Sequence, residues 1–345
     1  MNISRCSVHI YVYKKWCVLI LHCFIQVFIL HIHTELMKIF HTVEEVVQWR
    51  TQELRETRFR ETIGFVPTMG CLHSGHASLI SQSVKENTYT VVSIFVNPSQ
   101  FAPTEDLDNY PRTLPDDIKL LESLKVDVLF APNAHVMYPQ GIPLDIEEQK
   151  GPFVSVLGLS EKLEGKTRPN FFRGVATVVT KLFNIVMADV AYFGQKDIQQ
   201  FIVLQCMVDE LFVNTRLQMM PIVRNNNGLA LSSRNKYLCP ESLKISENLY
   251  RGLKAAENAI RRLAPGGRLS RSEIIDTVTQ IWAPYVDSHD FKIDYVSLAD
   301  FKTLDELSDV ENTSEQQPIV ISCAVYVTDR EKPDTVVRLI DNIVI

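Results

Sequence analysis

Pro67-Thr68-Met69-Gly70-Cys71-Leu72-His73-Ser74-Gly75-His76 is the most informative segment of this sequence. It follows the apolar run 63–66 and precedes a helical pattern, so it predicts a strand, a tight turn and a helix. Backbone N–H groups and the positive end of the helix dipole face outward at such a turn. We therefore expect a phosphate group to bind there.

The spacing of the two histidines has a chemical reason. His73 and His76 fall on the same side of the first helical turn, where both can donate hydrogen bonds to a phosphate in its transition state. The neighbouring glycines let the backbone approach a nucleotide with no Cβ in the way. Histidines near turns are common, so this short motif alone is a weak signal for attack on an α-phosphate.

A second segment strengthens the prediction of a nucleotide site. Residues 228–235 read Gly-Leu-Ala-Leu-Ser-Ser-Arg-Asn, and Ser232, Ser233 and Arg234 offer two hydroxyl donors and a permanent cation. These groups suit the β- and γ-phosphates of a nucleotide. The two segments together predict a nucleotide-dependent enzyme.

Strand and helix patterns alternate between these segments. Strands are expected at 62–67, 90–96, 127–131, 190–194 and 216–222, and helices at 75–86, 115–124, 173–186 and 196–211. This order predicts an α/β fold, a Rossmann-like parallel sheet covered on both faces. Ligands then bind at the carboxyl ends of the strands, where both motifs lie.

The turn cluster at 225–228 is the best candidate domain boundary. We expect a catalytic domain over residues 37–224 and a smaller α+β lid domain over 225–345. The latter contains helical patterns at 241–263 and 270–285 and strand patterns at 292–298, 318–328 and 335–345.

Composition excludes some classes of function. The net charge of −6 argues against a protein that grips nucleic acid, because such proteins carry a basic face. The seven cysteines show no Cys-x-x-Cys spacing, so we expect reduced thiols, with neither a zinc site nor a disulfide framework. These features favour a cytoplasmic small-molecule enzyme.

Residues 1–36 form an apolar extension of uncertain status. Trp16 to Ile32 is nearly free of polar residues, follows three basic residues and is slightly shorter than a membrane span. Three interpretations stay open: an upstream start codon assigned in error, with Met37 the natural start, a targeting segment, or a membrane anchor. Only the last two would bring this chain to a membrane.

Further motifs carry a resemblance to a known family. They are Val96-Asn97-Pro98-Ser99-Gln100-Phe101, Asp108-Asn109-Tyr110-Pro111-Arg112-Thr113, Leu163-Glu164-Gly165, Arg173-Gly174-Val175-Ala176-Thr177 and Phe193-Gly194-Gln195-Lys196-Asp197-Ile198-Gln199-Gln200. With the two segments above, they make residues 37–345 resemble the pantothenate synthetase family of the HIGH-type nucleotidyltransferase group. The resemblance implies an ATP-dependent ligase that joins pantoate to β-alanine through a pantoyl adenylate.

The resemblance also implies roles for individual residues. His73, His76, Lys196 and Arg234 would offset charge that develops during catalysis. The residues implied to bind ATP are Pro67, Met69, Gly75, His76, Gly194, Lys196, Asp197, Val223, Leu231, Ser232, Ser233 and Arg234. Those implied to bind pantoate are Gln100, Gln200, Met69 and Asn97, and an amide suits a hydroxy acid because it both donates and accepts.

Magnesium and a homodimer complete what the resemblance implies. Asp116 and Asp117 correspond to carboxylates near the Mg²⁺ that accompanies ATP, although as first-turn residues of a helix they need no such function.

The family commonly has a histidine after Arg168-Pro169, whereas this chain has Asn170-Phe171-Phe172. Another adenylate-forming nucleotidyltransferase of the same fold remains the alternative.

Overall fold

The computed structural model describes residues 36–345 apart from 57–60, 103–104, 106 and 313–316. Within the described residues, Ile39–Ile345 forms one compact unit. The apolar run from Trp16 to Ile32 lies outside the described residues. In the described part of the chain, no helix has both the length and the apolar character needed to cross a membrane.

A six-stranded sheet forms the centre of the nucleotide-motif region. Its strands lie in the order β1, β4, β3, β2, β5, β6, and the pairs from β4 to β6 are all parallel. The strands are β1 (Lys38–Phe40), β2 (Ile63–Thr68), β3 (Tyr89–Ile94), β4 (Val128–Phe130), β5 (Val190–Gly194) and β6 (Arg216–Met220). The predicted parallel α/β sheet is confirmed.

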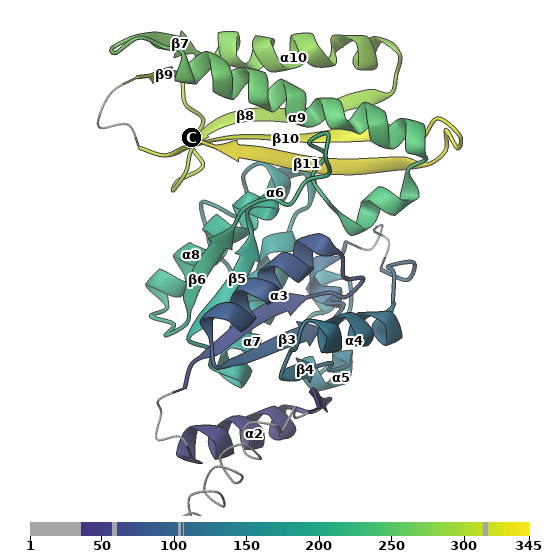
Figure 1. Ribbon diagram of the computed structural model, residues 1–345, viewed down its shortest axis with the longest axis vertical. Helices are drawn as coiled ribbons and strands as arrows, with labels where there is room; N and C mark the ends of the chain where they lie inside the picture. Colours follow the sequence, from purple (N-terminus) through teal and green to yellow (C-terminus); the bar gives the residue numbers. More distant parts are fainter. Residues whose placement is uncertain (1–35, 57–60, 103–104, 106, 313–316) are drawn as a thin grey trace, which may run out of the picture. The chain divides into compact units, whose positions relative to one another are not determined.

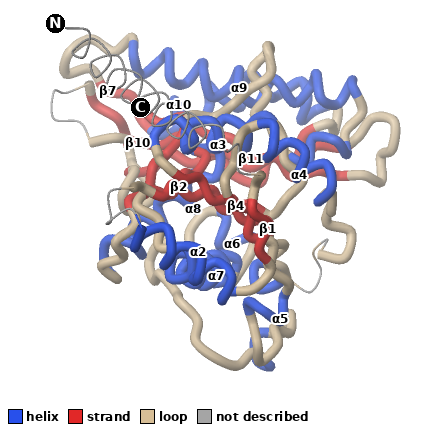
Figure 2. Tube along the Cα trace, turned by 60° about the horizontal axis from the view of Figure 1, so that its bottom comes forward, coloured by secondary structure: helices blue, strands red, loops and turns tan. Residues whose placement is uncertain are grey.

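Helices cover both faces of this sheet. Figure 2 shows α3 and α4 on one side, and α2 and α7 on the other. The helices are α2 (Val43–Glu56), α3 (Ser74–Glu86), α4 (Leu114–Ser123), α5 (Ala134–Met137), α6 (Glu164–Thr167), α7 (Phe171–Val186) and α8 (Ile198–Glu210), with 3₁₀ turns η1 (Pro98–Gln100), η2 (Ile146–Glu148) and η3 (Gln195–Asp197). Helix α7 is apolar on most sides, and most of its residues are buried.

The C-terminal part is built on a three-stranded antiparallel sheet in the order β11, β10, β8. Helices α9 and α10 lie along one face of it (Figure 1). The elements are η4 (Ser233–Tyr237), α9 (Pro240–Arg261), β7 (Arg268–Ser270), α10 (Arg271–Asp287), β8 (Phe291–Asp300), β9 (Asp309–Glu311), β10 (Ile319–Thr328) and β11 (Val336–Val344).

Strand β10 contributes to two hydrophobic clusters. Val320 packs in the cluster around the parallel sheet, whereas its neighbour Ile321 packs with α9 and α10. Successive side chains of a strand point to opposite faces, so one face of the antiparallel sheet points toward the helices and the other toward the parallel-sheet region. The turn predicted at 225–228 is present, with Gly228 at a φ of +104°.

Gly174 controls how closely α7 approaches η1. A Cβ on this residue would lie 2.2 Å from the carbonyl oxygen of Ser99 and 2.7 Å from the backbone nitrogen of Gln100. Both are backbone atoms, so neither can rotate away. Glycine at this position therefore lets α7 pack directly against the backbone of η1, which carries Gln100.

We expect Gly174→Ala to destabilise the protein by about 1–3 kcal/mol, because the overpacking cost exceeds the gain in helix propensity. Gly194→Ala is the matched control, since a Cβ there meets no atom within 4 Å and the glycine φ is −78°. Thermal unfolding of both variants checks this, and equal melting temperatures would contradict it.

Candidate functional site

The site lies where the strand order reverses. From β2 the chain proceeds to β3 and β4 on one side, and later to β5 and β6 on the other, so β2 and β5 are neighbours. The turn after β2 carries the two histidines, and the turn after β5 carries Gly194, Lys196 and Asp197. Such switch points bind ligands in open α/β sheets.

The two histidines cap helix α3 reciprocally. The backbone N–H of Gly75 donates to Nδ1 of His73 (3.1 Å), and the backbone N–H of His73 donates to Nδ1 of His76 (3.4 Å). Each Nδ1 is therefore an acceptor, which leaves the Nε2–H of each ring as its donor. A Cβ on Gly75 would lie 2.7 Å from the His73 ring, so this cap requires glycine.

Both rings are held in the neutral form. Burial, followed by the charge of His73, lowers the pKa of His76 to about 3. Burial, followed by the Lys196 ammonium, also lowers the pKa of His73. At neutral pH the pair acts through N–H dipoles, and the positive charge of this part of the site comes from Lys196.

Asp117 supports the histidine turn from behind. Its carboxylate accepts the backbone N–H groups of Cys71 (3.0 Å) and Leu72 (2.8 Å) and the hydroxyl of Thr113 (3.1 Å). These bonds hold Gly70 and Cys71 in left-handed conformations, with φ of +83° and +51°.

The same bonds argue against the expected metal site. Asp117 is 3% exposed and already accepts three hydrogen bonds from the protein, and Asp116 pairs with Lys119 on the surface at 3.1 Å. Neither residue lines the cavity described below, so this pair does not fit a magnesium ion. Among the described residues, no group of three or more histidine, cysteine or acidic side chains could hold a metal ion.

Gln100 is oriented by a buried amide. Asn97, 1% exposed, donates from Nδ2 to Gln100 Oε1 (3.0 Å) and accepts from the hydroxyl of Tyr138 (2.8 Å). Burial raises the pKa of Tyr138 to about 12, so its hydroxyl stays protonated. Gln100 thus turns its NH₂ toward Met69 Sδ, 3.2 Å away, and presents donors to the cavity.

The structure brings the other predicted residues together around one cavity of about 260 Å³. Sixteen positions predicted from the sequence line it: Pro67, Met69, His73, Gly75, His76, Asn97, Gln100, Gly194, Lys196, Asp197, Gln200, Val223, Leu231, Ser232, Ser233 and Arg234. Gly194 has no Cβ to fill the cavity, and Val223 accepts a backbone hydrogen bond from Leu231.

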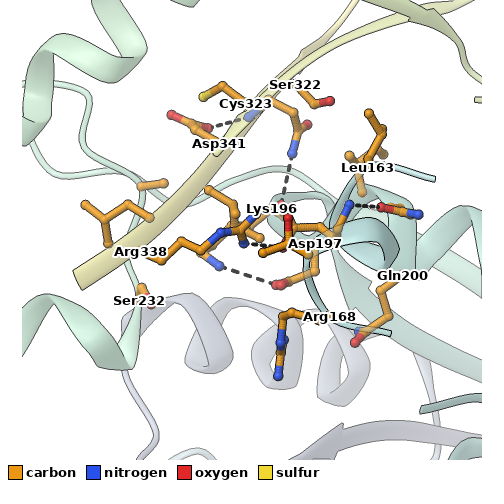
Figure 3. Close-up of a pocket in the computed structure, with 18 of the residues that line it drawn as sticks. Leu163, Arg168, Lys196, Asp197, Gln200, Ser232, Ser322, Cys323, Arg338 and Asp341 are labelled. Atoms are coloured by element: carbon orange, nitrogen blue, oxygen red, sulfur yellow. Dashed lines mark hydrogen bonds and ion pairs between the residues drawn. The ribbon is translucent and has the colours of Figure 1, made fainter. Parts of the chain in front are cut away.

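A second cavity of about 320 Å³ adjoins the first. Both cavities are lined by Arg168, Phe171, Lys196, Asp197, Gln200, Ser232 and Arg234. Figure 3 shows Arg168, Lys196, Asp197, Gln200 and Ser232 among the residues of the second cavity. Sequence reasoning did not find the contribution of β10 and β11 to its lining, since those strands carry no recognisable motif.

An ion cluster stands at the edge of this second cavity. Arg338 on β11 holds both carboxylate oxygens of Glu164, and Tyr295 donates to the same carboxylate at 2.9 Å. Arg338 also pairs with Asp294 at 2.7 Å. These contacts join the antiparallel sheet to helix α6.

The position of the absent histidine is accommodated locally. Asn170 takes a left-handed conformation, with φ of +68°, just before α7, and asparagine tolerates this region better than most residues. The next residue, Phe171, lies under the Arg168 guanidinium at 3.8 Å. Arg168 is further fixed by two bonds of 2.7 Å to Glu105.

Comparison with known proteins gives a consistent result. The family model described as pantoate-beta-alanine ligase matches residues 38–344. The pantothenate synthetase of Thermotoga petrophila is 42% identical over 309 residues, which is 90% of this chain and 100% of the relative. That of Thermotoga neapolitana is 43% identical over 310 residues, with the same coverage.

Solved structures agree. The pantothenate synthetase from Thermus thermophilus has a TM-score of 0.73 at 37% identity, covering 89% of this chain and 99% of that one. The pantoate-beta-alanine ligase from Francisella tularensis, complexed with β-γ ATP and β-alanine, has a TM-score of 0.64 at 32% identity, covering 89% and 97%. The resemblance inferred from the motifs is confirmed.

The lowered pKa of His76 predicts a pH dependence of stability. Below its ordinary pKa of 6.5, His76 binds a proton in the unfolded state but stays neutral in the folded state. The free energy of unfolding therefore decreases as the pH is lowered, by at most about 1.4 kcal/mol per pH unit. Glutamine also serves at this capping position without titrating. We expect His76→Gln to lose about 1 kcal/mol less stability than the natural protein between pH 7 and 5.5.

Denaturant unfolding at both pH values checks this expectation. His73 and the carboxylates titrate in both proteins and cancel in the comparison. Parallel pH profiles would show that His76 titrates normally in the folded state.

Proposed function

This chain belongs to the pantoate–β-alanine ligase family, and on that premise we propose that it condenses pantoate with β-alanine at the expense of ATP. Products are pantothenate, AMP and diphosphate. The observation that carries the proposal is the convergence of the histidine turn, the Lys196 turn and the Gln100 and Gln200 amides on one cavity at the β2/β5 switch point.

In the first step, the pantoate carboxylate attacks the α-phosphate of ATP. A bond forms between the carboxylate oxygen and phosphorus, and the bond to the leaving diphosphate breaks. Negative charge on the transferring phosphate is met by the Nε2–H groups of His73 and His76 and by the Lys196 ammonium. Ser232, Ser233 and Arg234 hold the β- and γ-phosphates, which become the leaving group.

The second step joins the amine. The neutral amine of β-alanine attacks the acyl carbon of the adenylate, a C–N bond forms, and the C–O bond to AMP breaks. The nitrogen gives up a proton and AMP leaves with the electron pair. No covalent bond to the protein is required, so positioning and exclusion of water supply the catalysis.

Each bound group has candidate partners. Gln100 and Gln200 hold the hydroxyl and carboxylate of pantoate beside Met69, and Asn97 acts through Gln100, to which it donates. Gly194 leaves room for the ribose, Asp197 accepts from its hydroxyls, and Val223 and Leu231 flank the adenine. Pro67 and Gly75 complete the ATP site.

The remaining features are part of the same proposal. Mg²⁺ enters with the ATP phosphates, whose charge it would neutralise, and Asp116 and Asp117 are not its ligands. The protein works in the cytoplasm as a homodimer, and residues 225–345 act as a lid on the catalytic domain formed by 37–224. The alternative, another adenylate-forming transferase of this fold, would not use pantoate as acceptor, so a test of pantoate distinguishes the two functions.

We expect pyrophosphate to exchange into ATP when pantoate is present and β-alanine is absent, because adenylation precedes attack by the amine. Isotope exchange with each substrate omitted in turn measures this. Exchange that required β-alanine would contradict a separate adenylation step, and exchange that did not need pantoate would favour another acceptor.

Replacing Lys196 by alanine removes the cation nearest the transition-state charge. We expect kcat to fall about 10²- to 10³-fold, with the fold intact by circular dichroism. Lys166→Ala is the control, since Lys166 is exposed on α6 and lines neither cavity. A loss below tenfold for Lys196→Ala would remove this lysine from the mechanism.

A further inference from the structure

The 3₁₀ turn that carries Lys196 has no side-chain cap of its own. Gly194 begins the turn and has no side chain, and Asp197, the residue before α8, makes no capping bond to that helix. The Asp197 carboxylate lies 3.6 Å from the Lys196 Nζ instead. Side-chain caps are the usual local means of fixing the start of a helix. The orientation of this turn is therefore left to contacts from other parts of the chain.

A buried amide on β11 makes such contacts. Asn342, 1% exposed, donates from Nδ2 to the backbone carbonyls of Gln195 at 2.9 Å and Lys196 at 3.0 Å. Its Oδ1 accepts a hydrogen bond from Nε2 of Gln195 at 3.1 Å. An amide has both donors and an acceptor, and here both functions serve one turn that lies far away in the sequence.

These three bonds fix the rotation of the turn. A 3₁₀ turn has about three residues per turn, so successive side chains point in different directions. Gln195 is held against β11, whereas the next residue, Lys196, lines both cavities. A different rotation of the turn would move the ammonium group away from the phosphates.

The strand that supplies Asn342 is anchored at the other nucleotide segment as well. Neighbouring residues of a strand point to opposite faces, so Asp341 reaches away from the 3₁₀ turn. Its carboxylate accepts two hydrogen bonds from Arg224, at 2.6 and 2.8 Å. Arg224 also donates to the carbonyl of Gly228, the first residue of segment 228–235, at 2.9 Å. Strand β11 thus connects the two segments that the proposed function assigns to the phosphates.

We propose that Asn342 is a positioning residue for the adenylation step, which sets the Lys196 ammonium against the α-phosphate by fixing the backbone of the turn. Asn342 acts through Lys196 and does not touch the reacting atoms. This proposal rests on the ligase function above. Misplacement of a reacting group by about 1 Å can slow a reaction roughly 100-fold, so loss of this amide should reduce kcat more than it changes substrate binding.

A double-mutant cycle tests the proposal. Asn342→Ala should lower the kcat of pantoate-dependent pyrophosphate exchange at least tenfold, with the KM for ATP and for β-alanine within twofold of the natural values. In the Lys196→Ala background the same change should cost less than twofold, because the residue through which Asn342 acts is already absent.

Asn248→Ala is the matched control. Asn248 is a buried, hydrogen-bonded asparagine of α9 that lines neither cavity, so this variant should keep exchange within twofold. Asn342→Ser keeps one short donor and should lose less activity than Asn342→Ala. Circular dichroism and thermal unfolding monitor the fold of each variant, and the cycle is run with Asn342→Ser if the alanine variant does not fold.

Four results would overturn the proposal. They are an exchange loss below tenfold in a folded Asn342→Ala variant, a cost of twofold or more without Lys196, a raised KM for β-alanine with unchanged exchange, and failure of both Asn342 variants to fold. The last result would make the amide a requirement of folding. Absence of exchange in the natural protein would instead contradict the ligase function.

Discussion

The reciprocal cap between His73 and His76 is the interaction on which the site depends. A helix begins with backbone N–H groups that need acceptors, and here imidazole nitrogens supply them. These two bonds start helix α3, and they also fix which nitrogen of each ring faces the cavity. Gly75 permits the approach, and Asp117 holds the preceding turn in its left-handed conformation. Catalytic geometry and helix initiation are thus the same local structure.

Much of this fold could be predicted from the sequence, and the reasons are local. The strand before residue 67 and the helix after residue 74 follow from apolar patterns broken by glycines, and β5 was predicted at its observed bounds, 190–194. Helix α8 was predicted to begin at Lys196 but begins at Ile198, because residues 195–197 form a 3₁₀ turn. Sixteen of the site residues that the family resemblance implied lie around one cavity.

What the sequence did not predict depends on long-range contacts. Asp117 looks equally like a helix-capping residue and a metal ligand, and only the position of the Cys71 and Leu72 amides distinguishes the two. Asn97 reads as a ligand-binding amide, whereas its buried bonds make it the support of Gln100. The pairing of Ser297 with Ser322 depends on the register of β8 and β10, which no local pattern contains.

Strand β11 holds the Lys196 turn through Asn342, whose side chain donates to the backbone carbonyls of Gln195 and Lys196. The same strand is tied down by Arg338 to Glu164, and by Asp341 to Arg224, in pairs whose side chains are at most 16% exposed. Dissolved salt screens such largely buried charge pairs much less than exposed ones. Ionic strength therefore acts unequally on this molecule: added salt weakens the attraction of phosphates to the open cavity, while the internal ties that position Lys196 keep their strength.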